Sequence, residues 1–236
     1  QGASRRVVNM EWDKFWAENK KVYEPASSRY MAVFRDDAVM VHLENVPAVV
    51  EVVSTPLVPK DPSRGERPLR RFNEILIEGG DAASLAEGEE VTLLRWGNCV
   101  MDRFERDASG RIVSIHARLN IGGDVRKTKK ITWLANVPDA VKAMLVEFDH
   151  LVTKKTLEDG DSVEDFVTPN SRVDTVALGD PALRNVQAGE VVQLERRGFF
   201  RCDRPYLSPD KPIVLFMIPD GKTRAMSTLS GALQHR

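Results

Sequence analysis

Short runs of branched and aromatic residues, separated by turn residues, restrict the fold of this chain more than any other feature. Beyond Pro25 such runs recur roughly every 8 to 15 residues, a spacing typical of barrels and sandwiches. Because so many short strands would otherwise leave exposed edges, the pattern favours two closed β-barrels. The predicted strands are 29–35, 37–44, 48–53, 74–78, 90–95, 99–105, 111–119, 130–135, 141–148, 190–196, 199–203 and 212–218.

Two stretches between the predicted strands look irregular. Residues 54–72 contain four prolines and several basic side chains, and residues 156–174 are acidic. Each is expected to form a long loop or a boundary between barrels. The sequence shows no internal repeat. In contrast, DASG at 107–110 is a clear hairpin turn, followed by a strand in which apolar and polar residues alternate.

One helical segment precedes the strands. In VNMEWDKFWAENKKVY the residues Val8, Trp12, Phe15 and Trp16 lie at helical spacing, and Asn9 can cap the first turn. The aromatic face of this amphipathic helix needs a surface to cover it. Packing on the chain's own core and packing on a neighbouring domain are both open.

Composition sets limits on the class of protein. The chain has 236 residues, 42% of them hydrophobic and 29% charged, which suits a globular protein with two modest cores. No apolar run reaches the roughly 18 residues that a membrane span needs, and no secretory signal opens the chain, so we expect an intracellular protein. Cys99 and Cys202 stand alone, which indicates packing residues rather than a zinc site or a disulfide.

The overall charge argues against non-specific nucleic-acid binding. Lys and Arg number 34 against 35 Asp and Glu, so the chain as a whole has no positive field. The basic residues are nevertheless clustered, and each cluster is either a solvated face or a local binding surface. The clusters are Lys60, Arg64, Arg67, Arg70 and Arg71, then RKTKK at 126–130, then Arg196, Arg197, Arg201 and Arg204.

Familiar catalytic motifs are absent from the sequence. It contains no GxxxxGK[ST], GxGxxG, GxSxG or HExxH, and its four histidines are far apart. We therefore predict no catalytic residue and no metal ligand in this chain.

The stretch VVQLERRGFF at 191–200 is unusual for a strand. Val192 and Leu194 would face a core, yet Gln193 and a run of charged side chains lie beside them. Two interpretations compete: an edge strand with a solvated face, or a surface that holds a flat polar partner such as a nucleotide base.

Five blocks appear in one order along the chain and decide between these interpretations. They are NKKVYEPASSRY at 19–30, LLRWGN at 93–98, KTKKITWLA at 127–135, LGDPAL at 178–183 and VVQLERRGFFRCD at 191–203. Together they resemble the C-terminal half of glutamyl-tRNA synthetase of the cytosolic, archaeal and eukaryotic type, a class I enzyme.

The resemblance implies an all-β fold: two β-barrels of the ribosomal-protein-like, glutaminyl-tRNA synthetase anticodon-binding type, preceded by a short N-terminal helical segment. It implies that residues 1–28 are the helical segment adjoining a catalytic domain outside this chain. Residues 29–78 together with 166–236 would form the proximal barrel, and residues 79–165 the distal barrel.

The resemblance also implies a function and a partner. The chain would bind the anticodon loop of tRNA(Glu) in the cytoplasm, for an ATP-dependent glutamate–tRNA ligase. HIGH-like and KMSKS-like motifs are missing, so ATP and Mg would belong to the absent catalytic domain, and no cofactor is expected here. Two alternatives are a docking module for other synthetases or a scaffold protein in a multi-synthetase complex, and a free-standing enzyme.

Three residues resemble those that surround the middle anticodon base, a uridine in this family. They are Arg29 in SSRY, and Gln193 and Arg196 in QLER, with Arg197 beside them. In a regular strand, residues three apart point to opposite faces, so both QLER residues can reach one base only if a bulge or a strand end lies near Gly198.

The reading of the other anticodon bases is less defined. Glutaminyl relatives carry arginines at the positions of Thr92 and Leu94, so those contacts do not transfer. Arg95 and Trp96 are the nearby candidates, with burial of Trp96 as the alternative. Phe199 and Phe200 are expected in the core.

Overall fold

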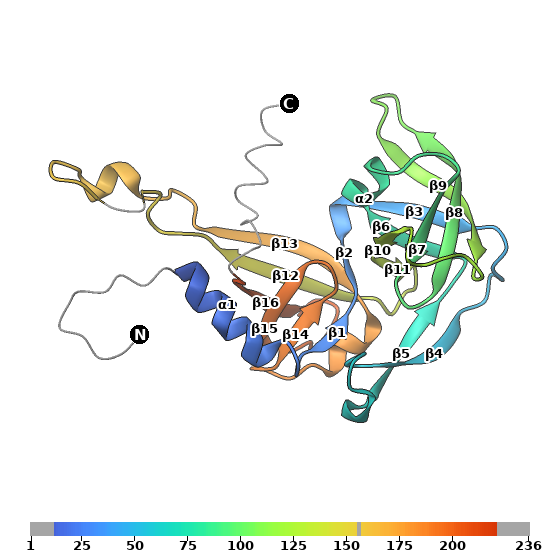
Figure 1. Ribbon diagram of the computed structural model, residues 1–236, viewed down its shortest axis with the longest axis horizontal. Helices are drawn as coiled ribbons and strands as arrows, with labels where there is room; N and C mark the ends of the chain where they lie inside the picture. Colours follow the sequence, from blue (N-terminus) through green and yellow to red (C-terminus); the bar gives the residue numbers. More distant parts are fainter. Residues whose placement is uncertain (1–11, 155–156, 221–236) are drawn as a thin grey trace.

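A computed structural model describes residues 12–154 and 157–220, and within them the chain forms sixteen strands and two α-helices (Figure 1). The predicted all-β fold with an N-terminal helix is confirmed. Helix α1 spans Trp12–Tyr23, while Val8 and its capping residue Asn9 lie outside the described residues. Helix α2 spans Gly79–Ala83, and four 3-10 turns are η1 (Arg35–Asp37), η2 (Pro62–Arg64), η3 (Val163–Phe166) and η4 (Pro181–Asn185).

Seven strands form one nearly closed, barrel-like sheet, here called the proximal sheet. In spatial order they are β1 (Ser28–Tyr30), β14 (Val191–Leu194), β15 (Gly198–Arg204), β16 (Ile213–Ile218), β12 (Val141–Phe148), β13 (Arg172–Gly179) and β2 (Ala32–Phe34). The outermost strands in this order, β1 and β2, are separated in the chain only by Met31. The sheet therefore curls until its two edges meet, which removes most of its free edge.

Seven other strands form a second such sheet, here called the distal sheet. Their spatial order is β10 (Lys129–Ile131), β7 (Glu89–Leu93), β8 (Gly97–Arg106), β9 (Ile112–Asn120), β3 (Ala38–Leu43), β6 (Glu74–Glu78) and β11 (Trp133–Ala135). Its edge strands β10 and β11 are likewise separated only by Thr132. A two-stranded hairpin, β4 (Glu51–Pro56) with β5 (Glu66–Arg71), completes the fold.

The two sheets repeat one topology, although the sequence shows no repeat. Along either spatial order the pairings run parallel, antiparallel, antiparallel, parallel, antiparallel, antiparallel. The closing strands come first in the chain for the proximal sheet and last for the distal sheet, so the sheets are circular permutants of each other. Consequently β14 and β15 of one sheet correspond to β7 and β8 of the other.

Strand pairing divides the chain differently from the predicted ranges. The range 29–78 assigned β3 and β6 to the proximal barrel, but both pair within the distal sheet. The range 79–165 assigned β12 to the distal barrel, but it pairs with β13 and β16 of the proximal sheet. The physical reason is the permutation: strand partners are set by closure across the barrel, which local sequence does not show.

Two strands lie where loops were predicted. Strand β5 lies inside segment 54–72, predicted as a long loop or a boundary between barrels, because its one proline, Pro68, lies in a two-stranded sheet where a missing ladder donor is tolerated. Strand β13 begins inside the acidic segment, since its first residues continue the ribbon with β12 beyond the barrel. Figure 1 shows this β12–β13 ribbon projecting on the side away from the distal sheet.

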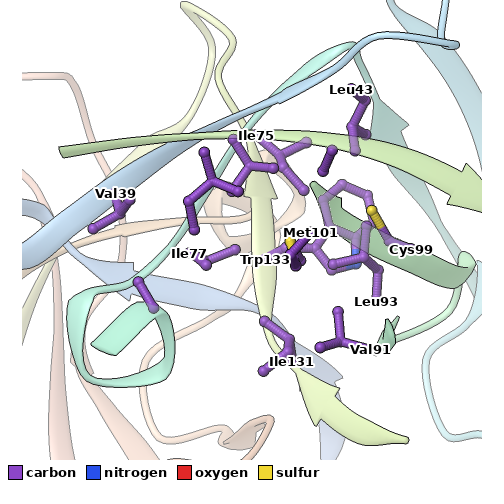
Figure 2. Close-up of a cluster of buried hydrophobic side chains, with 14 of the residues drawn as sticks. Val39, Leu43, Ile75, Ile77, Val91, Leu93, Cys99, Met101, Ile131 and Trp133 are labelled. Carbon is purple, nitrogen blue, oxygen red and sulfur yellow. The ribbon is translucent and has the colours of Figure 1, made fainter. Parts of the chain in front are cut away.

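Each sheet encloses its own apolar core. The distal core gathers Val39, Ile75, Ile77, Leu93, Met101 and Ile131 around the fully buried Trp133, whose Nε1 donates a hydrogen bond of 2.8 Å to the Leu94 carbonyl oxygen (Figure 2). The proximal core includes Tyr30, Leu145, Leu194 and Phe200. Cys99 and Cys202 are free and buried in these two cores, as predicted.

The aromatic face of α1 is largely uncovered within the described residues. Trp12 is 61% exposed, and its ring packs on those of Phe15 and Trp16. At its other end the helix lies on the outside of the proximal sheet, where Tyr23 contacts Phe199 with ring centroids 4.9 Å apart. Phe199 is therefore buried as expected, but under the helix rather than inside the barrel. No helix in the described ranges is long and apolar enough to cross a membrane.

Candidate nucleic-acid interface

Arg29 and Gln193, far apart in sequence, are direct neighbours in the proximal sheet. Strands β1 and β14 run parallel, and their register pairs Arg29 with Gln193. The flanking residues Tyr30 and Leu194 point into the proximal core. Because side chains alternate along a strand, Arg29 and Gln193 both point to the outer face of the sheet.

Unpaired polar atoms gather on this outer face. Nε of Arg29 and Oε1 of Gln193 are buried, and no described residue provides either with a hydrogen-bond partner. The Tyr23 hydroxyl is in the same condition, and its ring packs on Phe199, the β15 partner of Gln193. Burial raises the pKa of Tyr23 to about 12, with smaller contributions from Asp220 and Glu24, so the hydroxyl keeps its proton.

Such atoms favour a ligand. A buried donor or acceptor left without a partner costs about 1–3 kcal/mol, and native proteins tolerate few of them. A partner that brought matching hydrogen bonds to this face would recover that free energy.

The QLER segment leaves the strand immediately after these residues. Strand β14 ends at Leu194, and the Arg197 amide donates to the Leu194 carbonyl oxygen at 3.0 Å, which closes a tight turn before β15. Arg196 has a φ of 64°, in the left-handed region. The predicted strand end near Gly198 is thus present, and strand alternation does not hold Arg196 on the face opposite Gln193.

The first two residues of this turn pair with the distal part of the chain. Glu195 accepts hydrogen bonds from Arg95, with Nη2 to Oε1 at 2.6 Å. Arg196 forms two hydrogen bonds with Asp81 of α2, including Nη2 to Oδ1 at 2.8 Å. These bonds raise the pKa of Arg196, so its guanidinium stays charged.

The third residue of the turn makes a buried contact. The Arg197 guanidinium pairs with Glu78 at the end of β6 and lies 3.5 Å from the ring centroid of Phe34. Glu78 also accepts a hydrogen bond from the Phe34 amide at 2.8 Å. Burial lowers the pKa of Arg197 and raises that of Glu78, and the opposite charge of each partner counteracts this. Arg197 therefore joins the two sheets and is mostly buried.

Arg95 and Trp96 occupy the corresponding turn of the distal sheet. Arg95 has a φ of 62°, and the Trp96 amide donates to the Leu93 carbonyl oxygen at 3.0 Å, so the geometry of the β14–β15 turn is repeated. Trp96 packs on Trp133, with ring centroids 4.7 Å apart, and joins the distal core. The Arg95 side chain is held by Glu195.

The predicted residues thus fall into two groups. Arg29 and Gln193 lie side by side with unpaired atoms, and Arg196 lies in the turn that follows β14, with 41% of its side chain exposed. Arg95 and Arg197 are ion-paired between the sheets, and neither presents an open face.

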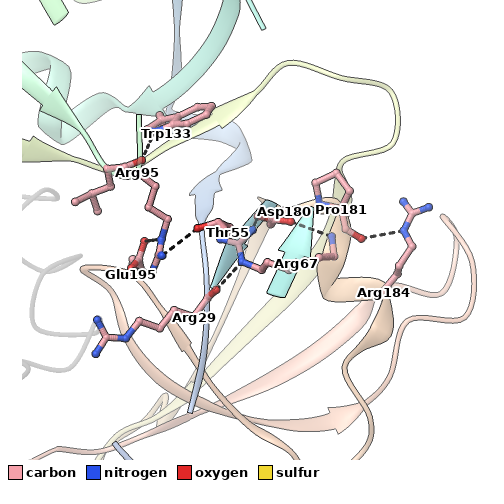
Figure 3. Close-up of polar contacts among 11 residues, drawn as sticks. Arg29, Thr55, Arg67, Arg95, Trp133, Asp180, Pro181, Arg184 and Glu195 are labelled. Atoms are coloured by element: carbon pink, nitrogen blue, oxygen red, sulfur yellow. Dashed lines mark hydrogen bonds and ion pairs between the residues drawn. The ribbon is translucent and has the colours of Figure 1, made fainter. Parts of the chain in front are cut away.

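A buried ion pair that sequence reasoning missed supports the strand of Arg29. Arg67 of β5 donates from Nε to the Arg29 carbonyl oxygen at 2.8 Å and pairs through Nη1 with Asp180 (Figure 3). Asp180 also accepts from the Ala182 amide at 2.9 Å, and its pKa is raised by burial against the opposing effect of Arg67. The sequence signal was only that Arg67 belongs to a basic cluster and Asp180 to the LGDPAL block.

No group of three or more His, Cys, Asp and Glu side chains that could hold a metal ion occurs in the described part of the chain.

Comparison with known families identifies the class of domain. Two family models, both described as the anti-codon binding domain of class I (E and Q) tRNA synthetases, match residues 27–120 and 130–203. The chain belongs to this family of anticodon-binding domains.

The relatives specify the type within that family. The chain is 44% identical over 223 residues to the cytoplasmic glutamate–tRNA ligase of Arabidopsis thaliana. The aligned region covers 94% of this chain and 31% of that protein. It is 40% identical over 227 residues to the cytoplasmic enzyme of Saccharomyces cerevisiae, again with 94% and 31% covered. It is therefore an anticodon-binding domain of the glutamyl-tRNA synthetase type.

A bifunctional enzyme is also similar. The glutamate/proline–tRNA ligase of Cricetulus griseus is 42% identical over 238 residues, with 97% of this chain and 16% of that protein covered. The chain thus spans at most about a third of the relatives named here. Both family models describe anticodon binding, which favours this role over the alternative of a docking module.

Proposed function

We propose that this chain holds the anticodon loop of tRNA(Glu) and that Arg29, Gln193 and Arg196 recognise its middle base, a uridine. The observation that carries the proposal is the pairing of Arg29 with Gln193 on an outer face where a donor and an acceptor are buried without partners. Bases in RNA loops are unstacked, so their edges are open to such side chains.

The chemistry of these side chains matches uracil. The Watson–Crick edge of uracil presents acceptor, donor and acceptor in order, and a complementary surface must supply donor, acceptor and donor. The Gln193 amide supplies the central acceptor and one donor, and a guanidinium supplies the second donor. With the amide in that orientation, cytosine would place its N4 donor against the Gln193 NH2 group and its N3 acceptor against the Gln193 oxygen. Arg29, the partner of Gln193 in the sheet, and Arg196, in the turn that follows β14, are the guanidinium groups proposed for this second donor.

Phosphate contacts would position the loop without reading its sequence. Specific RNA recognition depends more on local amide and guanidinium groups than on net charge. A nearly neutral chain can therefore bind a specific RNA loop. The segment RKTKK at 126–130 leads into β10, an edge strand of the distal sheet, with most of its side chains exposed, and is suited to this task. The binding affinity should accordingly fall as salt rises.

The parent protein would attach glutamate to the tRNA. We place that ATP-dependent reaction, with its ATP and Mg, in a catalytic domain outside this chain. The names of the relatives support a cytoplasmic enzyme, and the bifunctional ones make other synthetases reasonable neighbours.

Binding to an anticodon stem–loop RNA tests the proposal directly. Fluorescence anisotropy would compare the tRNA(Glu) stem–loop with one whose middle uridine is cytidine, for the parent chain and for Arg29→Ala and Gln193→Ala. Each substitution should cost about 1–3 kcal/mol of binding free energy and relax the preference for uridine. Matched controls are Arg172→Ala, an exposed arginine of the β12–β13 ribbon, and Gln187→Ala in a loop. Folded Arg29 and Gln193 variants that bind as tightly as the parent chain would disprove the assignment.

A further inference from the structure

The carboxylate of Asp81 holds the guanidinium of Arg196 in one plane. Both hydrogen bonds use the terminal nitrogens Nη1 and Nη2, so this pair leaves the Nε hydrogen and the other terminal hydrogens unused. The Asp81 side chain is 15% exposed and that of Arg196 is 41% exposed. The carboxylate therefore lies on the inner side of the pair, and the guanidinium on the side open to a ligand.

The supports of this pair are themselves fixed. The residues before and after Arg196 in the turn are held by Arg95 and Glu78, so three consecutive residues are attached to the distal part of the chain. On the other side, a Cβ at Gly79 would lie 2.7 Å from the Asp37 backbone oxygen, so the start of α2 lies tightly against η1. Arg196 and Asp81 thus meet between two well-anchored backbones.

We infer that Asp81 is a positioning residue of the uridine site, which fixes the plane and direction of the Arg196 guanidinium before RNA arrives. The inference rests on the function proposed above. A planar donor group held in advance loses little side-chain freedom on binding and keeps its hydrogens aligned with one base edge. A freely rotating arginine would instead serve any carbonyl or phosphate within reach, with less selectivity.

A simpler role for Asp81 predicts the opposite result. If the carboxylate were only a negative charge near the RNA backbone, its removal would strengthen binding of every stem–loop equally. If it positions Arg196, its removal should lower the preference for uridine whatever happens to the absolute affinity. The ratio of the two dissociation constants, cytidine over uridine stem–loop, separates these roles.

The experiment measures that ratio for the parent chain, Asp81→Asn, Arg196→Ala and the double variant. Asp102→Asn is the matched control, because Asp102 also accepts two hydrogen bonds from one arginine, from Nε and Nη2 of Arg118 at 2.8 and 2.7 Å, and its substitution removes the same charge. The ratio should fall roughly tenfold in Asp81→Asn, the size of one good base contact, and stay unchanged in Asp102→Asn. In the Arg196→Ala background, Asp81→Asn should have no further effect.

Two results would overturn the positioning role while the proposed function stands. In the first, folded Asp81→Asn keeps the ratio of the parent chain while Arg196→Ala lowers it. In the second, Asp81→Asn lowers the ratio equally in the parent chain and in Arg196→Ala. A parent chain with no preference for uridine would instead defeat the proposed function and this inference with it. Thermal melting checks each fold. If Asp81→Asn unfolds at a lower temperature than the parent chain, Arg196→Lys replaces it in the experiment. Lysine keeps both charges of the pair but lacks the planar guanidinium. An undiminished ratio in Arg196→Lys would also overturn the positioning role of Asp81.

Discussion

Replacing Arg67 with methionine tests whether the buried pair with Asp180 holds β1 in place. Arg67 is 3% exposed and Asp180 is 1% exposed, so methionine fills most of the space but leaves the carboxylate without its cation. The Asp180 carboxylate would keep only the hydrogen bond from the Ala182 amide, and the Arg29 carbonyl oxygen would lose the bond from Arg67.

The magnitude follows from these losses. Removing one partner of a buried ion pair costs about 3–5 kcal/mol, and the bond from the charged Nε to the Arg29 carbonyl oxygen is lost with the same guanidinium and is not added separately. We expect a loss of about 4 kcal/mol in the free energy of unfolding. For a chain of this size that corresponds to a fall in Tm of roughly 8–16 °C.

Circular dichroism during urea and thermal unfolding measures the change. Asp180→Asn in the Arg67→Met background removes the uncompensated charge, while the amide oxygen can still accept from Ala182. This double variant should recover about 2 kcal/mol, because the two sites are coupled. A cost below about 1 kcal/mol for Arg67→Met, or a double variant no more stable than the single one, would refute the reasoning.

Three further substitutions or reactions test other parts of the fold. Gly79→Ala should cost about 1–3 kcal/mol in chemical denaturation, because its Cβ would meet the backbone of η1, whereas Gly80→Ala, where a Cβ meets nothing, is the neutral control. Trp133→Phe should cost about 2 kcal/mol in the same assay, since the Leu94 carbonyl oxygen loses its donor, and equal stability would show that the bond is dispensable. Burial raises the pKa of the Cys99 thiol to about 12, so near pH 8 it should react with a thiol reagent only after urea unfolding, and rapid reaction of the native chain would contradict this.

Local sequence indicated most of the strands, although it missed β5 and β13. The turn Asp107–Gly110 lies between β8 and β9 as expected, because its turn residues and the alternation after it occur within a few consecutive residues. One exception is instructive: Val113 is exposed although it fits the apolar alternation, since register shifts between β8 and β9 change which residues face the core.

The resemblance to a known family, rather than local pattern, singled out most of the candidate site. Arg29, Gln193 and Arg196 were predicted from the SSRY and QLER blocks, and the structure brings the first two into register. The sequence could not indicate Asp81. This residue pairs with Arg196 across a separation of 115 residues and lies in a short helix with no distinctive motif. Nor could the sequence show that Arg197 is buried between the sheets, because guanidinium groups on a solvated face and in an interface look alike in sequence.

What the sequence determined by itself is therefore the periodicity of most strands, the clearest turns, and the residue types available for binding RNA. What only the tertiary structure decided is the sheet to which each strand belongs, as for β3, β6 and β12, and the partner of each charged side chain. The physical reason is the sequence distance over which each kind of interaction acts. Alternation and turn chemistry act over a few neighbouring residues, whereas sheet closure and buried ion pairs join distant segments and depend on the packing of both cores at once.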